Sequence, residues 1–324
     1  MSSETVQKPA AQGASSATAA TIVIPTRNRP EAVHQCLRII WQQIGGRSDV
    51  EVIVCDDSDD LSTHTLLHTH FPSVRWLQGA RKGAGANRNL GAQHATSPFL
   101  IFVDDDCLPQ PTWLMAYLAA ANQPNVSRCI FIGPTRCLRG LPSLGWEAPT
   151  NESASGMPSC NFAVSRANFL AIGGFDDRFT PAFEDMEFQA RSLVTGIRGE
   201  LLLDAVVDHP PRKTPSARVL ADRWYPQVIY ALDLGASPSQ LYCQYLRHVL
   251  GVIVSRIREH PAPLRNVHMI PRFSAEFLLV AISLRQWIQR AASDTRSAFW
   301  ADPKNRCAVQ GFGIGARQRG GISS

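Results

Sequence analysis

Four apolar runs of strand length alternate with three amphipathic segments in the first hundred residues. In chain order the apolar runs are 21–25, 50–55, 74–77 and 99–103. The segments between them, which carry apolar residues at helical spacing or open with helix-start signals, are 30–43, 60–70 and 83–95. Strands that alternate with helices indicate βαβ units and a parallel sheet, so we predict an α/β fold class.

The second half of the chain has a less regular pattern. A Gly-, Pro- and Ser-containing stretch, 139–159, is predicted to be a long loop, and a helix is predicted from Phe183 to about residue 195. Short strands are expected at 201–203 and 205–207, and helical segments near 217–234, 238–259 and 273–292. We therefore divide the chain into a disordered tail (1–20), an α/β domain (21–212), a C-terminal helical region (213–300) and an irregular tail (301–324).

Polar groups follow three of the four apolar runs. They are Pro25-Thr26-Arg27, Asp56-Asp57-Ser58 and Asp104-Asp105-Asp106. In an open parallel sheet, ligands bind beyond the carboxyl ends of the strands, where these groups fall. Three adjacent carboxylates repel one another, so the acidic triplet persists most easily if a cation neutralises it. Mg²⁺ and Mn²⁺ suit such ligands and usually complete their shells with water and phosphate, which points to metal-assisted chemistry on a phosphorylated molecule.

Composition and charge narrow the classes of partner. The 324 residues are 44% hydrophobic and 18% charged, and the formal net charge is +5. This mild excess favours anionic partners such as nucleotide-sugars or a membrane surface. The chain carries no motif of interleaved aromatic and basic residues, so we expect no nucleic-acid partner.

The cysteines and the apolar runs bear on the cellular compartment. None of the eight cysteines forms a CxxC pair, and several lie in apolar runs, which indicates buried thiols in a reducing compartment and argues against a zinc site. The apolar runs 249–254 and 277–284 are far shorter than the ~20 residues of a membrane span. We expect a cytoplasmic protein, soluble or peripheral to the inner face of the membrane.

Six short motifs occur in a fixed order between residues 21 and 212, followed by His209. They are VIPTRNR (23–29), VCDDS (54–58), GAGANRNLG (83–91), FVDDD (102–106), GGFD (173–176) and FEDMEF (183–188). In this order the chain resembles the family 2 glycosyltransferases, which have the GT-A fold, a Rossmann-like fold of nucleotide-diphospho-sugar transferases. The resemblance implies inverting transfer of a sugar from a nucleotide-diphosphate sugar, with UDP-sugars favoured. The implied acceptor is a carbohydrate, a lipid-linked molecule or a small molecule.

The resemblance also implies a role for each matching residue. Those that would bind the donor nucleotide are Pro25, Thr26, Arg27, Asp57, Arg88, Asn89, Asp104 and Asp105. Among them, Asp57 is implied to hold the base, and Asp104 and Asp105 to lie near the ribose and the metal.

Metal and base complete the implied site. Asp106 corresponds to the direct ligand of Mn²⁺ or Mg²⁺, and His209 to a metal or phosphate contact. Such an ion helps a diphosphate to depart by acting as a Lewis acid. Asp185 corresponds to the base that accepts the proton of the acceptor hydroxyl, with Glu184 beside it.

Several of these residues equally suit structural roles. Asp56-Asp57-Ser58 fits a turn and a helix N-cap, because Asp and Ser satisfy free N–H groups there. Glu184 and Asp185 suit the positive end of a helix. His209, just before two prolines, fits a strand-end histidine without a ligand.

Two alternative functions and two interpretations of the C-terminal helices remain possible from the sequence. A sugar nucleotidyltransferase would be expected to carry a glycine-rich loop after the first strand, and residues 25–29 contain no glycine. A non-catalytic nucleotide-sugar-binding module is the second rival, and the presence of Asp106 and Asp185 argues against it. Arginines among the apolar residues after Pro215 fit an ordinary packing face with solvated arginines, or a peripheral membrane face for a lipid-linked acceptor.

Overall fold

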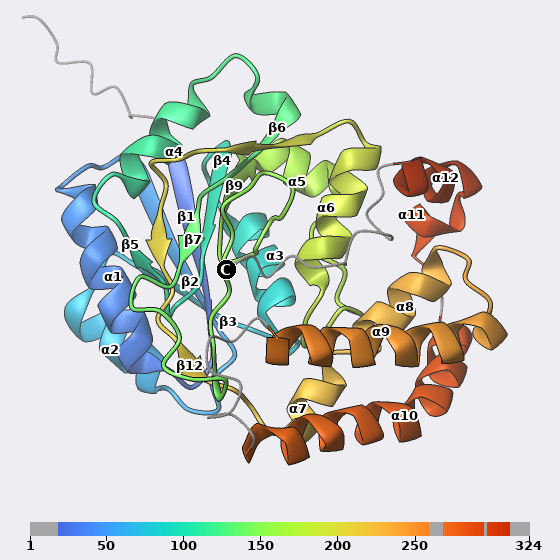
Figure 1. Ribbon diagram of the computed structural model, residues 1–324. Helices are drawn as coiled ribbons and strands as arrows, with labels where there is room; N and C mark the ends of the chain where they lie inside the picture. The colour runs from blue at the N-terminus through green and yellow to red at the C-terminus, as the bar shows by residue number, and fades with distance from the viewer. Residues whose placement is uncertain (1–18, 259–267, 295–296, 312–324) are drawn as a thin grey trace, which may run out of the picture.

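A seven-stranded sheet with helices on both faces forms the first part of the molecule (Figure 1). The computed structural model describes residues 19–258, 268–294 and 297–311. The strand order is β10-β6-β9-β4-β1-β2-β3. The strands are β1 (Ala20–Thr26), β2 (Val50–Asp56), β3 (Arg75–Gln78), β4 (Phe99–Val103), β6 (Cys129–Ile132), β9 (Asn161–Ser165) and β10 (Arg198–Leu201). The α/β fold class is confirmed.

The sheet departs from the predicted parallel arrangement at one strand. β9 pairs antiparallel with both β4 and β6, whereas the other pairs are parallel. Parallel strands need a crossover connection, usually a helix. Residues 133–160, which join β6 to β9, contain only the two-residue strands β7 (Thr135–Arg136) and β8 (Trp146–Glu147), so the chain returns antiparallel.

Two small sheets lie beside the large one. The first has the order β5-β11-β7, with β5 (Leu108–Pro109) and β11 (Val207–Asp208) antiparallel. The second pairs β8 with β12 (Arg212–Lys213). The strand predicted at 201–203 lies instead at 198–201, and residues 203 and 204 form a turn. The pairing of β5 with β11 places the residues that follow β11 close to the residues that follow β4.

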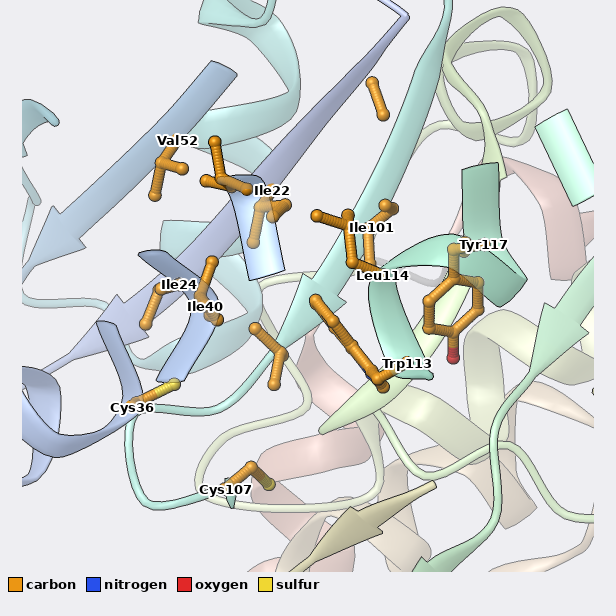
Figure 2. Packing of buried hydrophobic residues seen from close by; sticks show 14 of the residues in the cluster. Ile22, Ile24, Cys36, Ile40, Val52, Ile101, Cys107, Trp113, Leu114 and Tyr117 are labelled. Carbon is orange, nitrogen blue, oxygen red and sulfur yellow. The ribbon is translucent and has the colours of Figure 1, made fainter. Parts of the chain in front are cut away.

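Side chains alternate between the two faces of the sheet, as a strand period of two requires. Ile22 and Ile24 of β1 face one core with α1 (Pro30–Ile44), α2 (Ser62–His70) and α4 (Trp113–Ala121). Figure 2 shows this core, in which Trp113 and Tyr117 of α4 pack near Ile101. Val23 faces the other core with α3 (Ala84–His94), α5 (Arg166–Ile172) and α6 (Glu184–Val194).

The C-terminal helices build a core of their own. They are α7 (Ala217–Asp222), α8 (Tyr225–Asp233), α9 (Pro238–Arg258), α10 (Ile270–Ser293), α11 (Ala298–Ala301) and α12 (Pro303–Gly311). This core joins Trp224, Val249, Val280 and Leu284 and reaches α6 through Ala190. Trp300 ties α11 to α6, because its Nε1 donates to Glu187 Oε1 at 2.7 Å. No helix among the described residues is long and apolar enough to cross a membrane.

Both predicted tails differ from the structure where it describes them. Ala20 already belongs to β1, and residues 1–18 lie outside the described residues. Residues 303–311 form α12, so the prediction of an irregular tail was wrong there, while residues 312–324 lie outside the described residues.

Candidate active site

The acidic triplet follows β4 at the carboxyl edge of the sheet, and its middle member is buried. Thr26 Oγ1 donates to Asp105 Oδ2 at 2.6 Å, and Arg29 Nη2 lies 2.9 Å from Oδ1. Burial raises the pKa of Asp105 to about 7, while Arg29 and Thr26 act in the opposite direction. Asp105 therefore ties the end of β4 to the end of β1, and its side chain has no exposed surface.

Asp106 faces His209, a residue 103 positions away in the sequence. Asp106 Oδ1 lies 3.3 Å from His209 Nε2, and Asp106 Oδ2 accepts a hydrogen bond from Arg29 Nη1 at 2.7 Å. His209 Nδ1 lies 3.1 Å from the carbonyl oxygen of Pro210, which turns Nε2 toward the carboxylate. Burial lowers the pKa of His209, but Asp106 outweighs it and raises the pKa to about 9. Burial raises the pKa of Asp106, but the opposite effect of His209 and Arg29 is larger. The pKa of Asp106 therefore lies well below its usual range.

These two side chains fit a divalent cation. Asp106 Oδ1 is buried and has no hydrogen-bond partner, because its contact with His209 is not aligned as a hydrogen bond. Two ligands bound side by side at ~2.1 Å from Mg²⁺ lie roughly 3 Å apart, close to the observed 3.3 Å. Cys107 Sγ also lies within 4.8 Å of the two ligand atoms. Contact with Cys160 and burial raise the pKa of the Cys107 thiol, which makes it the poorest donor of the three. His209 would have to give up the proton that Asp106 favours before its Nε2 could bind a metal.

Arg88 connects the triplet to the start of α6. Its side chain is 1% exposed, its Nη2 pairs with Asp104, and its Nη1 lies 3.1 Å from Glu184 Oε1. Ser159 Oγ donates to the same Glu184 oxygen at 3.1 Å. Because these carboxylates engage both terminal nitrogens of Arg88, the residue positions β4 and α6 relative to each other.

Asp185 lies in the first turn of α6 and is partly exposed. Its Oδ1 accepts a hydrogen bond from the backbone N–H of Met186 at 2.7 Å. Burial and the neighbouring Glu184 carboxylate raise the pKa of Asp185 to about 7. The preceding residue, Phe183, has φ +77°, a left-handed conformation that is strained for an aromatic residue. Phe183 is held there by Phe179 and Tyr230, whose ring centroids lie 6.3 and 5.3 Å from its own.

Two residues predicted to contact the donor, Asp57 and Asn89, form hydrogen bonds with backbone groups. Both oxygens of Asp57 accept N–H groups of the following loop, from Arg81 at 2.9 Å and Gly83 at 3.0 Å. A Cβ on Gly79 would lie 2.1 Å from Asp57 Oδ1, so this position requires glycine for close approach. Asn89 donates to the carbonyl of Phe175 and accepts its N–H, both at 2.8 Å. These side chains shape the loops at the edge of the sheet.

The structure separates the two structural roles predicted for residues 56–58, a helix N-cap and a turn. No side chain caps α2, whose N-cap position is Leu61, so the helix-cap reading of residues 56–58 was wrong. The predicted turn is present at Asp56, because its Oδ1 accepts the N–H of Ser58 at 2.8 Å.

Two further residues predicted to bind the donor lie at the end of β1 and just after it. Pro25 lies in β1 opposite Cys55, and Arg27 is exposed, 3.8 Å from Asp59.

Two basic residues at the triplet were missed from the sequence. Arg29 bridges Asp105 and Asp106, and Arg212 Nη1 lies 3.8 Å from Asp106 Oδ2. Arg212 stands on β12, where Glu147 Oε1 lies 3.3 Å from its Nε. Arg29 ends the VIPTRNR motif, which was a usable signal, whereas Arg212 reaches Asp106 only through the pairing of β12 with β8.

Sequence comparisons relate this chain to known glycosyltransferases. Residues 21–137 match the model of "Glycosyl transferase family 2". Validoxylamine A glucosyltransferase of Streptomyces hygroscopicus subsp. jinggangensis is 27% identical over 218 residues, which cover 55% of this chain and 52% of the relative. Pre-mycofactocin glycosyltransferase of Mycobacterium tuberculosis is 28% identical over 208 residues, covering 59% of this chain and 43% of the relative. The chain thus spans about half the length of these curated relatives.

Solved structures share the fold at low sequence identity. A mannosyltransferase from Pyrobaculum calidifontis, crystallised with GDP-Man and Mn²⁺, aligns with a TM-score of 0.50 at 18% identity, over 94% of this chain and 82% of that chain. S. aureus TarS 1-349 in complex with UDP-GlcNAc aligns with a TM-score of 0.50 at 16% identity, over 91% and 92%. Both are GT-A glycosyltransferases. Residues 21–137 thus carry the sequence pattern of glycosyl transferase family 2, and the named relatives of this chain are glycosyltransferases.

Proposed function

We propose that this protein transfers a sugar from a nucleotide-diphosphate sugar to an acceptor hydroxyl, with a divalent metal held by Asp106 and His209. The observation that carries the proposal is the buried, unpartnered Oδ1 of Asp106 facing His209 Nε2 at 3.3 Å. This pair lies at the carboxyl edge of the sheet, where α/β proteins bind ligands. Arg88 joins the same edge to α6, which carries the partly exposed Asp185.

The residues around the pair suit a departing diphosphate. Mn²⁺ or Mg²⁺, when bound, acts as a Lewis acid that offsets the charge of the leaving group. Arg212 is 48% exposed and lies beside Asp106, so it can offer a second positive charge to the same anion. Arg29 holds Asp106 in place through the oxygen that does not face His209.

Asp185 supplies the proton chemistry in this proposal. Its carboxylate accepts the proton of the acceptor hydroxyl as the acceptor oxygen forms its bond to the anomeric carbon. The bond from that carbon to the diphosphate breaks at the same time, and the electron pair leaves with the diphosphate. Attack from the face opposite the leaving group inverts the anomeric centre. A pKa near 7 keeps a substantial fraction of Asp185 ionised at neutral pH while it remains basic enough to accept a proton.

The sugar donor is proposed in order of preference. UDP-sugars come first, following the resemblance of the motifs, and GDP-sugars come second. The two structural neighbours were crystallised with one donor of each kind, UDP-GlcNAc and GDP-Man. The named relatives are a validoxylamine A glucosyltransferase and a pre-mycofactocin glycosyltransferase, so a small-molecule acceptor comes first here, with carbohydrate and lipid-linked acceptors as the other classes.

Thermal shift with UDP- and GDP-sugars, with and without Mn²⁺, tests the donor and metal site. Wild type should show a donor-induced shift that requires Mn²⁺, and Asp106→Ala should lose it. Asp222→Ala, which removes an exposed aspartate of α7, is the matched control and should behave as wild type. A shift that Asp106→Ala retains, or that is equal without metal, would contradict the proposed site.

A further inference from the structure

Helices α9 and α10 run antiparallel (Figure 1), and both expose large apolar side chains. Tyr242 OH donates to the carbonyl of Ala281 at 3.2 Å near one end, and Arg256 pairs with Glu276 nearer the other. One side of each helix is buried in the C-terminal core. Outside this core the two helices expose large apolar residues, and we name four of them the α9–α10 face: Tyr242 (39% exposed), Leu250 (49%), Leu278 (57%) and Ile282 (77%).

The charged side chains that α9 and α10 themselves expose have a single sign. Residues 238–258 contain no acidic side chain, and α10 contains only Glu276, which is fully buried and paired with Arg256. The exposed arginines of the two helices are Arg247, Arg258, Arg285 and Arg290. Arg285 follows Ile282 by three positions, so the two share one side of α10. The face therefore combines exposed apolar groups with cations and no exposed acid on either helix.

We propose that the α9–α10 face binds the surface of an anionic lipid bilayer. Helices with apolar side chains on one side and arginines beside them lie in the interface plane, where the apolar groups enter the headgroup boundary. The long arginine side chains reach back to the phosphates, and each one near the surface strengthens binding by about fivefold. This binding mode needs no membrane span.

A second copy of the chain is a weaker candidate for the occupant of this face. A two-fold interface brings the same patch from both copies together. Arg247 and Arg285 of one copy would then approach those of the other, with no exposed carboxylate on α9 or α10 to pair with them. An anionic bilayer offers the opposite charge. The inference concerns binding alone and stands apart from the proposed transfer reaction.

Vesicle co-sedimentation of the full chain tests this proposal. Wild type should bind vesicles of phosphatidylcholine and phosphatidylglycerol at least ~10-fold more tightly than phosphatidylcholine alone, and binding should weaken in 0.5 M salt. Leu278→Glu/Ile282→Glu should reduce the binding at least ~10-fold. Arg285→Glu should reduce it about fivefold or more. Leu203→Glu alters a leucine that is 68% exposed in the turn after β10, and it should bind as wild type.

The outcomes separate the alternatives. Equal sedimentation with both vesicle types, or wild-type binding by Leu278→Glu/Ile282→Glu, would overturn the proposal. Sedimentation velocity without vesicles tests whether a second copy of the chain occupies the α9–α10 face. A dimer that Ile282→Glu dissociates would overturn the membrane proposal in favour of self-association. Because all four replaced side chains (Leu203, Leu278, Ile282 and Arg285) are exposed, circular dichroism should show wild-type folding in all variants.

Discussion

Replacing Asp185 by asparagine separates the chemistry of the carboxylate from its effect on stability. Asparagine keeps the size of the side chain and an oxygen that can accept the hydrogen bond from Met186 N. It cannot accept the proton of an acceptor hydroxyl, so we expect the transfer rate to fall ~10²–10⁴-fold. Donor binding should change little, because Asp185 acts on the acceptor in the proposed reaction.

The same substitution should stabilise the fold at alkaline pH. Burial and Glu184 raise the pKa of Asp185 from its ordinary 3.8 to about 7. The folded state therefore resists ionisation, and its stability falls as pH rises from about 4 through 7. A difference of about 3 pH units corresponds to about 4 kcal/mol as an upper bound. Partial exposure of Asp185 reduces this by solvent screening, so we expect Asp185→Asn to gain about 2 kcal/mol at pH 8 and under ~1 kcal/mol at pH 5.

Urea unfolding of wild type and Asp185→Asn at the two pH values measures this difference. Asp177→Asn is the matched control, because Asp177 is an exposed aspartate in the loop before α6 and should show no such dependence on pH. The reasoning fails if the Asp185→Asn gain is the same at pH 5 and pH 8. It also fails if the variant keeps wild-type transfer activity.

Three further substitutions test other contacts of the site. Arg88→Met should destabilise the fold by ~3–5 kcal/mol in urea unfolding, because Asp104 and Glu184 lose a buried partner; a loss under ~1 kcal/mol would contradict the pairing. Glu184→Gln removes the like charge beside Asp185, so the acid limb of the kcat/KM profile should move about one pH unit lower, and an upward move would refute this. Asn161→Ala removes the shared acceptor of two buried aromatic donors, Trp113 and Tyr117, and the side-chain donor to the Ala205 carbonyl, while the Pro134 carbonyl keeps the N–H of Val207; it should cost ~3 kcal/mol or more in the free energy of unfolding, with Ser153→Ala expected to cost nothing measurable.

The strand ends could be predicted because their signals are local. Each apolar run ends at a polar group, and parallel strands bring their carboxyl ends to one edge, so Asp57 and the acidic triplet were expected together. The pairing of Asp106 with His209 was different, since it depends on the two-residue strands β5 and β11. Such short strands carry no period that a sequence reveals, and only the family resemblance pointed to His209.

The elements that were missed lack a readable pattern for definite reasons. The sequence of α4, WLMAYLAAA, is apolar on nearly every side, so it shows no amphipathic period. The four residues of β6 are buried between β9 and β10 and give no alternation. We did not predict α12, because the Gly- and Arg-rich composition of the last residues led us to treat 303–311 as part of an irregular tail.

The exact partners of the charged residues could not be derived from spacing either. Arg29 is three positions from Thr26 in the sequence, yet both meet Asp105 because the chain turns after β1. Asp57 and Asn89 have the expected positions, but their hydrogen bonds go to backbone groups of loops. Which atoms a polar side chain meets depends on loop conformation, which the periodicity of the sequence does not encode.

The most direct test of the central claim is release of nucleoside diphosphate from nucleotide-sugars, with water as the acceptor. Wild type with Mn²⁺ should release UDP or GDP from at least one donor, and chelation with EDTA should stop the release. Asp106→Ala should be inactive with Mn²⁺, while Asp222→Ala should match wild type. If wild type binds a donor but releases no nucleotide, the chain is a binding module; if release is unchanged in Asp106→Ala or in EDTA, the metal site at Asp106 and His209 is wrong.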